Sequence, residues 1–225
     1  VQSPNGIHFR QDKQGFTRQI IEDLLEERQL KKDQRDACDA DSEQYAVYDR
    51  QQTAVKVIMN SLYGVMAWNR FRMYDLEVAS ATTATGRACI QHTADVVEDM
   101  GYELLYGDTD SVLIQLSDAP RDEMLDAGFA VEDRINESYD EFARETLDTE
   151  NHKFDIEFEK LYERYFQAGQ PKRYAGKITW KEGKDVDYLD VTGFQYKRSD
   201  FSPLSKEVQG TMLEMICEGG DPDEV

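Results

Sequence analysis

The chain has 225 residues, of which 46 are acidic and 26 are basic, and its formal net charge is −20. Hydrophobic residues make up 40% of the chain, which excludes wholesale disorder, and no apolar run approaches the length that crosses a membrane. The three cysteines are odd in number and widely spaced, which argues against a disulfide framework or a zinc site and predicts reduced thiols in the cytoplasm.

Two long helices are predicted within residues 15–66, joined by a polar connection at residues 33–43. In the first helix, four apolar residues recur at helical spacing: Ile20, Ile21, Leu24 and Leu25. Arg28 and Lys32 lie one turn apart on the same face. They either pair with neighbouring glutamates or form part of a cradle for a polyphosphate, in which arginine binds two oxygens and lysine acts as a point charge.

The second helix also carries apolar residues at helical spacing, and Gly64 is predicted to end it. The apolar face is formed by Val47, Ala54, Val55, Ile58, Met59 and Leu62. The opposite face is predicted to hold a polar stripe, with spacings of four, four and three residues: Gln52, Lys56, Asn60 and Tyr63. Such a stripe is either a solvated helix surface or, with the cations of the first helix, the second wall of a polyphosphate cradle.

A further helix is predicted over residues 78–100, and a hairpin over residues 102–116. The tip of this hairpin, at residues 106–111, contains Asp108 and Asp110 separated by one residue. Two carboxylates at a tight turn are a cluster of hard oxygen ligands suited to Mg²⁺. The alternative is a hairpin tip that is merely polar, because aspartate, glycine, serine and threonine are also the residues that turns prefer.

The rest of the chain is predicted to form another helix, over residues 124–147, and further strands. Apolar residues then alternate with acidic ones, as in a half-buried strand, at Phe154, Ile156 and Phe158. Within this alternation, Glu157 is expected to be a solvent-facing acid, although it could add a carboxylate near a metal. A second hairpin is predicted over residues 177–191, with its turn at residues 182–184.

Five segments, in this order, resemble motifs of family B DNA polymerases, most closely those of the archaeal replicative enzymes. In turn they resemble the first fingers helix, motif B, motif C, the Lys-Lys-x-Tyr segment that holds the primer-template duplex, and the crossing from palm to thumb. They occupy residues 23–29, 48–64, 106–111, 171–176 and 193–209. In the fourth segment, Pro171 stands where the family often has its first lysine, which puts part of the duplex contact in question.

The resemblance implies an α+β fold, with antiparallel two-helix fingers and part of a palm in which an antiparallel sheet carries the catalytic hairpin. It also implies a domain organisation along the chain. Residues 1–14 would be the palm-to-fingers junction and residues 15–66 the fingers helices. Residues 67–205 would be the motif C half of the palm with the duplex-binding segment, and residues 206–225 the start of the thumb.

The resemblance further implies template-directed attack of a primer 3′-hydroxyl on the α-phosphorus of a deoxynucleoside triphosphate, with two Mg²⁺ ions as cofactors. Asp110 corresponds to the family's metal-bridging aspartate, and Asp108 to a less direct, supporting one. The residues that match triphosphate and nascent base-pair contacts are Arg28, Lys32, Lys56, Asn60 and Tyr63. The residues that match primer-template contacts are Lys172, Arg173 and Tyr174.

Several parts of such a polymerase have no counterpart in the sequence: motif A with its metal-binding aspartate, the exonuclease domain and most of the thumb. We therefore expect a partial polymerase that is inactive without the motif A segment. One alternative is a non-catalytic nucleic-acid-binding or assembly subunit derived from such a polymerase. Another is a metal-dependent glycosyltransferase that binds a sugar nucleotide through residues 108–110, but that interpretation assigns no role to the helical polar stripe.

The net charge opposes DNA binding, because phosphate contacts dominate such binding. Either the chain does not bind nucleic acid, or acidic residues cover its outer surface and leave a local basic groove. The second interpretation is favoured because basic residues cluster near the motifs, at residues 28–35, 56, 70–72, 172–177 and 197–198. An acidic surface of this kind is expected of a protein from a salt-saturated cytoplasm, where screening reduces the self-repulsion of its charges to a range of about 3 Å. We therefore predict a haloarchaeal source.

Overall fold

The computed structural model describes residues 1–195 and 199–220, so the predicted basic pair at 197–198 and the last five residues of the predicted thumb segment lie outside it. Helices and small antiparallel sheets make up the described chain, which confirms the α+β class. It forms two compact units. The first contains residues 1–95 and 138–153, and the second contains residues 96–137 and the described residues from 154 onward.

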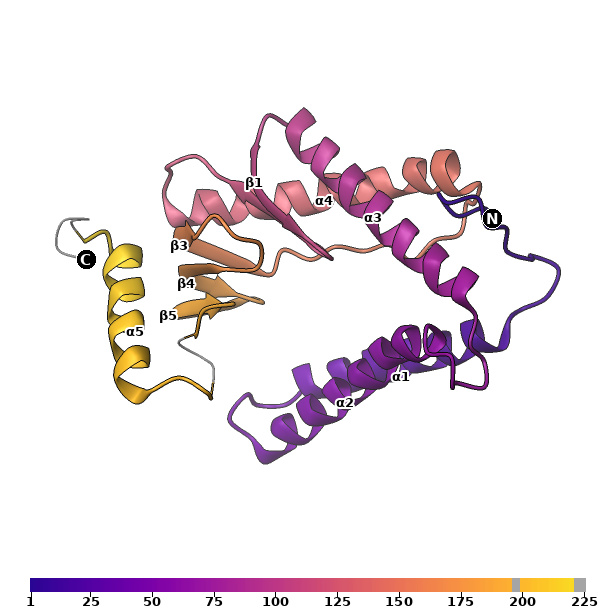
Figure 1. The fold of residues 1–225 in the computed structure, drawn as a ribbon, viewed down its shortest axis with the longest axis horizontal. Helices are drawn as coiled ribbons and strands as arrows, with labels where there is room; N and C mark the ends of the chain where they lie inside the picture. The colour runs from indigo at the N-terminus through magenta and orange to yellow at the C-terminus, as the bar shows by residue number, and fades with distance from the viewer. Residues whose placement is uncertain (196–198, 221–225) are drawn as a thin grey trace. The chain divides into compact units, whose positions relative to one another are not determined.

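In the first unit, α1 (Phe16–Asp36) and α2 (Glu43–Met66) lie side by side, as Figure 1 shows. The two predicted long helices are therefore confirmed, with a connection at residues 37–42. The Ser42 hydroxyl caps α2 by accepting a hydrogen bond from the Tyr45 N–H at 3.1 Å. Arg35 ties the pair together, because its Nη1 lies 3.2 Å from Oδ1 of Asp49 and its guanidinium stands 5.7 Å from the centre of the Tyr45 ring.

The predicted end of the second helix at Gly64 is wrong, since α2 continues to Met66. A glycine ends a helix when its backbone takes the left-handed conformation, and Gly64 does not adopt a positive φ. The helix closes instead at Ala67, whose right-handed backbone donates its N–H to the Val65 carbonyl. The segment that resembles motif B, residues 48–64, therefore lies entirely within one continuous helix.

Three residues of α2 are also not on the predicted faces. Gln52, expected on the polar stripe, is only 9% exposed, and its Oε1 accepts a hydrogen bond from Nε of Arg28 at 3.3 Å. Ala54 and Ile58, expected on the buried face, are both exposed, and Ile58 is 53% exposed. The physical reason is that the contact with α1 lies on the side of the helix that includes Val55 and Gln52, so that side is buried regardless of polarity.

The first unit also contains most of α3 (Leu76–Asp99) and the end of α4 (Arg121–Leu147), so both predicted helices are confirmed with slightly earlier starts. Small residues allow close packing along α3, where the buried ones are Ala79, Ala81, Ala84 and Ala94. Two hydrogen bonds connect α3 to α4: one joins Thr93 and Tyr139 hydroxyls at 2.9 Å, and the other joins His92 Nε2 and the Ser138 hydroxyl at 2.8 Å.

The second unit contains both predicted hairpins. The first consists of β1 (Glu103–Asp108) and β2 (Ser111–Gln115). The second consists of β4 (Tyr174–Lys181) and β5 (Lys184–Thr192), and β4 also pairs with β3 (Lys160–Gln167) to complete a three-stranded antiparallel sheet in the order β3-β4-β5. The core of this sheet includes Ile178, which is fully buried.

The stretch around Phe154, Ile156 and Phe158 was predicted to be a strand and is not one. Its side chains do alternate between half-buried and exposed, as predicted. This stretch is extended but precedes β3 and belongs to no sheet. Side chains of α4 satisfy its backbone instead: the amide of Asn136 exchanges two 2.9 Å hydrogen bonds with Ile156, and Glu132 Oε2 accepts the Phe158 N–H. Glu157 is exposed within this stretch.

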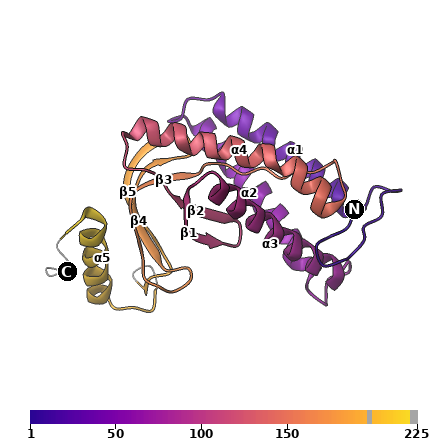
Figure 2. The same ribbon diagram turned by 90° about the horizontal axis from the view of Figure 1, so that it is seen from above.

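Helix α5 (Pro203–Glu218) packs on the three-stranded sheet, which the view in Figure 2 shows from above. Its buried face contributes Leu213 and Cys217 to a core shared with Ala175 and Val191 of the sheet. The predicted thumb boundary at residue 206 thus falls inside this helix.

Candidate active site

The predicted carboxylate turn has the expected geometry. Asp108 ends β1 and pairs with Ser111 at the start of β2, which leaves Thr109 and Asp110 as the two turn residues. Oδ1 of Asp108 accepts hydrogen bonds from the Thr109 backbone N–H at 2.8 Å and from the Thr109 hydroxyl at 3.0 Å. Asp110 is exposed at the tip. The short turn therefore holds one carboxylate against the backbone and presents the other to solvent.

Lys172 joins this turn from a segment that is distant in the chain. Its Nζ lies 3.1 Å from Oδ1 of Asp108. The Thr109 N–H and the Lys172 ammonium both hold the pKa of the Asp108 carboxyl below its usual value. The same ion pair raises the pKa of Lys172. The structure thus brings the motif C aspartate together with a residue of the predicted duplex-binding segment.

The backbone at Lys172 is also fixed against the hairpin. Its N–H donates a 2.9 Å hydrogen bond to the hydroxyl of Tyr106, and its φ of 62° lies in the left-handed region. Gly193 packs so closely on it that an added Cβ would meet the Lys172 carbonyl oxygen. Because Gly193 itself has a φ of 73°, this position requires glycine for two independent reasons.

A series of tyrosine rings connects the hairpin to the sheet. Tyr106 lies 6.2 Å from Tyr174, Tyr174 lies 5.6 Å from Tyr165, and Tyr165 lies 5.7 Å from Tyr162, measured between ring centres. Burial raises the pKa of Tyr165 to about 12, and its hydroxyl is buried without a hydrogen-bond partner among the described residues. This series positions the side chain of Tyr174, which the sequence singled out.

The far end of the series is anchored by Asp190 of β5. Its Oδ2 accepts hydrogen bonds from the Tyr162 hydroxyl at 2.9 Å and from Nζ of Lys160 at 3.2 Å. Burial lowers the pKa of Lys160, but the charges of Asp190 and Glu159 outweigh that effect and raise it. None of these residues was predicted from the sequence as part of a site, although the closely spaced aromatic residues of β3 were an available signal.

The donors at the turn fit a hard divalent cation, because they are carboxylate oxygens at an accessible tip. Within residues 1–195 and 199–220, no group of three His, Cys, Asp or Glu side chains is placed to hold a metal ion. Asp108 and Asp110 therefore offer two carboxylates, and a complete metal site would need further ligands from outside the described part of the chain.

The predicted triphosphate-binding residues all lie in the first unit. On α1, Arg28 and Lys32 are half-buried, and Arg28 is held by the buried amide of Gln52. Gln52 in turn donates a 3.1 Å hydrogen bond to Oδ1 of Asp49, which orients the amide oxygen toward Arg28. On α2, the predicted residues with exposed side chains are Lys56, Asn60 and Tyr63.

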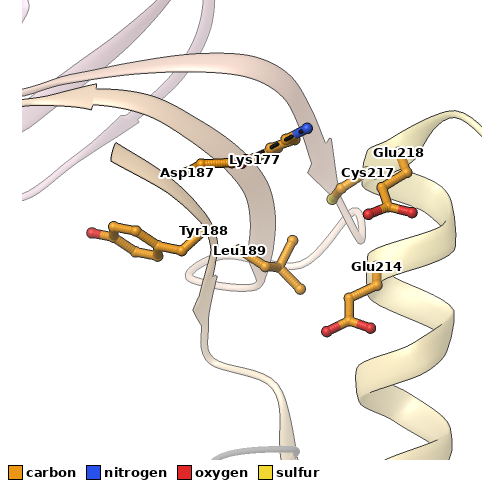
Figure 3. Close-up of a pocket in the computed structure, with 7 residues that line it drawn as sticks. All are labelled: Lys177, Asp187, Tyr188, Leu189, Glu214, Cys217 and Glu218. Carbon is orange, nitrogen blue, oxygen red and sulfur yellow. Dashed lines mark ion pairs between the residues drawn. The ribbon is translucent and has the colours of Figure 1, made fainter. Parts of the chain in front are cut away.

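The remaining candidate residues, Lys172, Arg173 and Tyr174, lie in the second unit with both aspartates, at the start of β4. A cleft of about 200 Å³ in that unit lies between the sheet and α5, where Lys177 forms an ion pair with Asp187 (Figure 3). None of the predicted site residues lines this cleft.

Comparisons with known proteins agree with the resemblance. The family model described as DNA polymerase family B matches residues 2–224. The chain is 33% identical over 219 residues to DNA polymerase 2 of Aeropyrum pernix, covering 97% of this chain and 24% of that protein. It is 34% identical over 213 residues to the DNA polymerase of Paramecium bursaria Chlorella virus NY2A, covering 90% of this chain and 22% of that protein.

A solved structure resembles the fold as well. The family B DNA polymerase from the hyperthermophilic archaeon Pyrobaculum calidifontis matches with a TM-score of 0.69 and 30% identity, covering 100% of this chain and 25% of that one. The chain thus spans about a quarter of the length of these relatives. In the described residues, no helix has the length and apolarity required to span a membrane. The matched family model and the shared fold establish that the chain belongs to DNA polymerase family B.

Proposed function

We propose that the chain is part of a DNA-directed DNA polymerase, and that its residues serve template-directed transfer of a nucleotide from a deoxynucleoside triphosphate to a primer 3′-hydroxyl. The observation that supports this most strongly is the pairing of Asp108 with Lys172 at 3.1 Å. This contact places the motif C carboxylates beside the segment whose family counterpart holds the primer-template duplex. A contact between these two segments is expected of a polymerase palm, because the primer end must reach the catalytic carboxylates.

In this proposal, Asp110 and Asp108 hold two Mg²⁺ ions together with a carboxylate from the motif A segment. When bound, such ions lower the pKa of the primer hydroxyl and stabilise the negative charge of the leaving oxygens. Asp110 has the more direct role because it is exposed at the tip, whereas Asp108 is held by Thr109 and Lys172. Lys172, Arg173 and Tyr174 contact the backbone of the duplex, which positions it without reading its sequence.

The fingers helices hold the incoming nucleotide in this proposal. Arg28, Lys32, Lys56 and Asn60 bind the triphosphate and compensate the negative charge that develops on it during transfer. Tyr63 lies against the nascent base pair. The hydrogen bond from Arg28 to Gln52 supports this assignment, because it leaves the two terminal guanidinium nitrogens available for phosphate oxygens.

Other parts of the polymerase complete the enzyme. They are the motif A palm segment, the exonuclease domain and the thumb, and the chain is inactive without the first of these. The division into junction, fingers, palm and thumb at residues 1–14, 15–66, 67–205 and 206–225 remains part of this proposal. We also propose a cytoplasmic location and a halophilic source, although the relatives reported above include other archaea and a virus.

The proposal is tested by Mg²⁺-dependent primer extension in molar potassium chloride. The chain is assayed by itself and mixed with a polypeptide that carries the motif A segment of a family B polymerase. Extension is expected only in the mixture, and Asp110→Asn is expected to abolish it. The matched control is Asp118→Asn, which neutralises another exposed aspartate of the same unit beyond the end of β2 and should leave extension unchanged.

Two results would contradict the proposal. Extension by the mixture that survives Asp110→Asn would remove Asp110 from the metal site. Binding of primer-template with no extension in any mixture would instead support a non-catalytic nucleic-acid-binding subunit.

A further inference from the structure

The carboxylate turn between β1 and β2 has one oxygen atom with more donors than it can fully bind. Oδ1 of Asp108 lies 2.8 Å from the Thr109 backbone nitrogen, 3.0 Å from the Thr109 hydroxyl and 3.1 Å from Nζ of Lys172. An ionised carboxylate offers about two lone-pair sites on each oxygen, so three donors already exceed the capacity of Oδ1. A cation that binds through this oxygen therefore has to displace one of them.

Of the three donors, the Lys172 ammonium is the one that can leave. Both Thr109 donors belong to the residue next to Asp108, and its N–H is held by the backbone of the turn. The Lys172 side chain is 62% exposed and carries its charge on a flexible aliphatic stem. Because ion pairs between exposed side chains contribute little stability, a cation of higher charge can replace the ammonium.

The backbone of Lys172, by contrast, is held beside the turn. Its N–H donates to the Tyr106 hydroxyl at 2.9 Å, and Gly193 lies so close that an added Cβ would meet the Lys172 carbonyl oxygen. Tyr106 belongs to β1, the strand that ends at Asp108. The Lys172 side chain thus starts from a fixed point near Asp108, and its ammonium can reach the carboxylate or turn away from it without movement of the backbone.

Charge favours exchange over simultaneous binding. The negative charge of Asp110 acts on the Lys172 ammonium in addition to that of Asp108, so the ammonium neutralises part of the charge of both carboxylates. Two cations at one carboxylate would repel each other. We propose that Lys172 is a stand-in for a divalent cation: its ammonium occupies Asp108 when no cation is bound there and leaves when one binds.

This inference rests on the proposed function, because it takes the carboxylate turn to be the metal site of a polymerase. In that enzyme, the released ammonium would become available to the backbone of the primer-template duplex. By linkage, binding of the cation and binding of the duplex through Lys172 would then favour each other.

The proposal is tested by NMR on the whole isotope-labelled chain, with Mg²⁺ alone as the probe. The buffer contains the lowest potassium chloride concentration at which circular dichroism shows the chain to be folded. The ammonium signal of Lys172 is identified by its loss in Lys172→Met. It should be present without Mg²⁺, disappear on saturation with Mg²⁺, and be absent from Asp108→Asn. A signal that persists at saturating Mg²⁺, or that is already missing without it, would overturn the proposal.

The backbone signals of Thr109 and Asp110 report Mg²⁺ at the turn separately from Mg²⁺ at other acids. Lys172→Met should tighten this binding about two- to fivefold, as expected for the loss of a competing surface ion pair. Lys172→Arg keeps a cation at the same left-handed backbone position and should bind Mg²⁺ like the parent chain. The matched control is Arg134→Met, which removes another exposed cation of the same unit and should leave the affinity unchanged.

A double-mutant cycle separates direct exchange from repulsion at a distance. In the Asp108→Asn background, Lys172→Met should change the Mg²⁺ affinity clearly less than in the parent chain, because the carboxylate for which the two cations compete is gone. An equal gain in both backgrounds would show that Lys172 acts only through its charge at a distance. That result, or the absence of any gain in the parent chain, would refute the exchange.

The variant Asp110→Asn distinguishes a failure of this inference from a failure of the proposed function. If Asp110→Asn weakens Mg²⁺ binding at the turn while Lys172→Met has no effect, the exchange is refuted and the proposed metal site stands. If neither Asp110→Asn nor Asp108→Asn weakens this binding, the proposed metal site itself is refuted. If Lys172→Met tightens the binding while primer extension fails in every mixture, the exchange stands and the polymerase proposal is refuted.

Discussion

Nζ of Lys172 lies 3.1 Å from Oδ1 of Asp108, so a cation from the segment before β4 directly contacts the carboxylate turn between β1 and β2. The contact has an electrostatic and a geometric consequence. It stabilises the ionised form of Asp108, and it ties the start of β4 to the hairpin. In the proposed enzyme, a residue that contacts the duplex would therefore also influence the carboxylates that hold the metals.

The first prediction concerns the pKa of Asp108, which should lie below the ordinary value of 3.8. In Lys172→Met the pKa should rise yet remain below 3.8, because the Thr109 backbone N–H still donates to the carboxylate. Since the pKa is lowered by folding, the stabilisation is present above the unfolded pKa and is lost as the pH falls through the folded pKa. The loss therefore occurs on the acid side of 3.8.

The measurement is a pH titration of the Asp108 carboxyl carbon by NMR. Thr109→Val serves as a control, because it removes the hydroxyl donor and keeps the backbone donor. An Asp108 pKa that does not change in Lys172→Met would show that the ion pair is not formed in solution.

The second prediction concerns the buried amide of Gln52. Gln52→Met preserves the side-chain size but removes the hydrogen bonds to Arg28 and Asp49, so the free energy of unfolding should fall by about 1 to 2 kcal/mol. Gln51→Met is the matched control, since Gln51 is exposed on the same helix and its change should have little effect. Urea unfolding followed by circular dichroism gives both values, and equal stabilities of the two variants would argue against the buried network.

The third prediction compares two glycines. Gly193→Ala should destabilise the protein by at least about 2 kcal/mol, because alanine is strained at a φ of 73° and its Cβ would meet the Lys172 carbonyl. Gly64→Ala should instead stabilise it by about 0.5 to 1 kcal/mol, since Gly64 lies inside α2 and its added Cβ would meet no described atom within 4 Å. Opposite signs of the two changes, measured by urea unfolding, are the expected result, and a Gly193→Ala protein as stable as the parent would contradict it.

The fourth prediction follows from the net charge of −20. Self-repulsion destabilises the folded state in dilute buffer, so the melting temperature should rise steeply with potassium chloride up to the molar range. Sucrose at matched osmolality provides the control, because it favours the compact state without screening charge. A melting temperature that is as high in dilute buffer as in molar potassium chloride would rule out a halophilic protein.

Elements whose causes are local could be predicted from the amino-acid sequence. The two long helices α1 and α2 follow from apolar residues at helical spacing, and the hairpin that carries Asp108 and Asp110 follows from two apolar runs around a turn of small polar residues. These preferences act between residues a few positions apart, so they can be read without knowing the rest of the fold. The motifs that carry the family resemblance are local in the same sense.

The relationships between distant segments could not be predicted in this way, because they depend on how the chain folds. Gln52 is buried because α1 packs on its side of α2, and the stretch around Ile156 is no strand because Asn136 of α4 binds its backbone. The ion pair of Lys172 with Asp108 likewise depends on where β4 starts relative to the hairpin. Such contacts are not encoded in any periodicity, because a side chain pairs with whatever the folded chain places within a few ångströms of it.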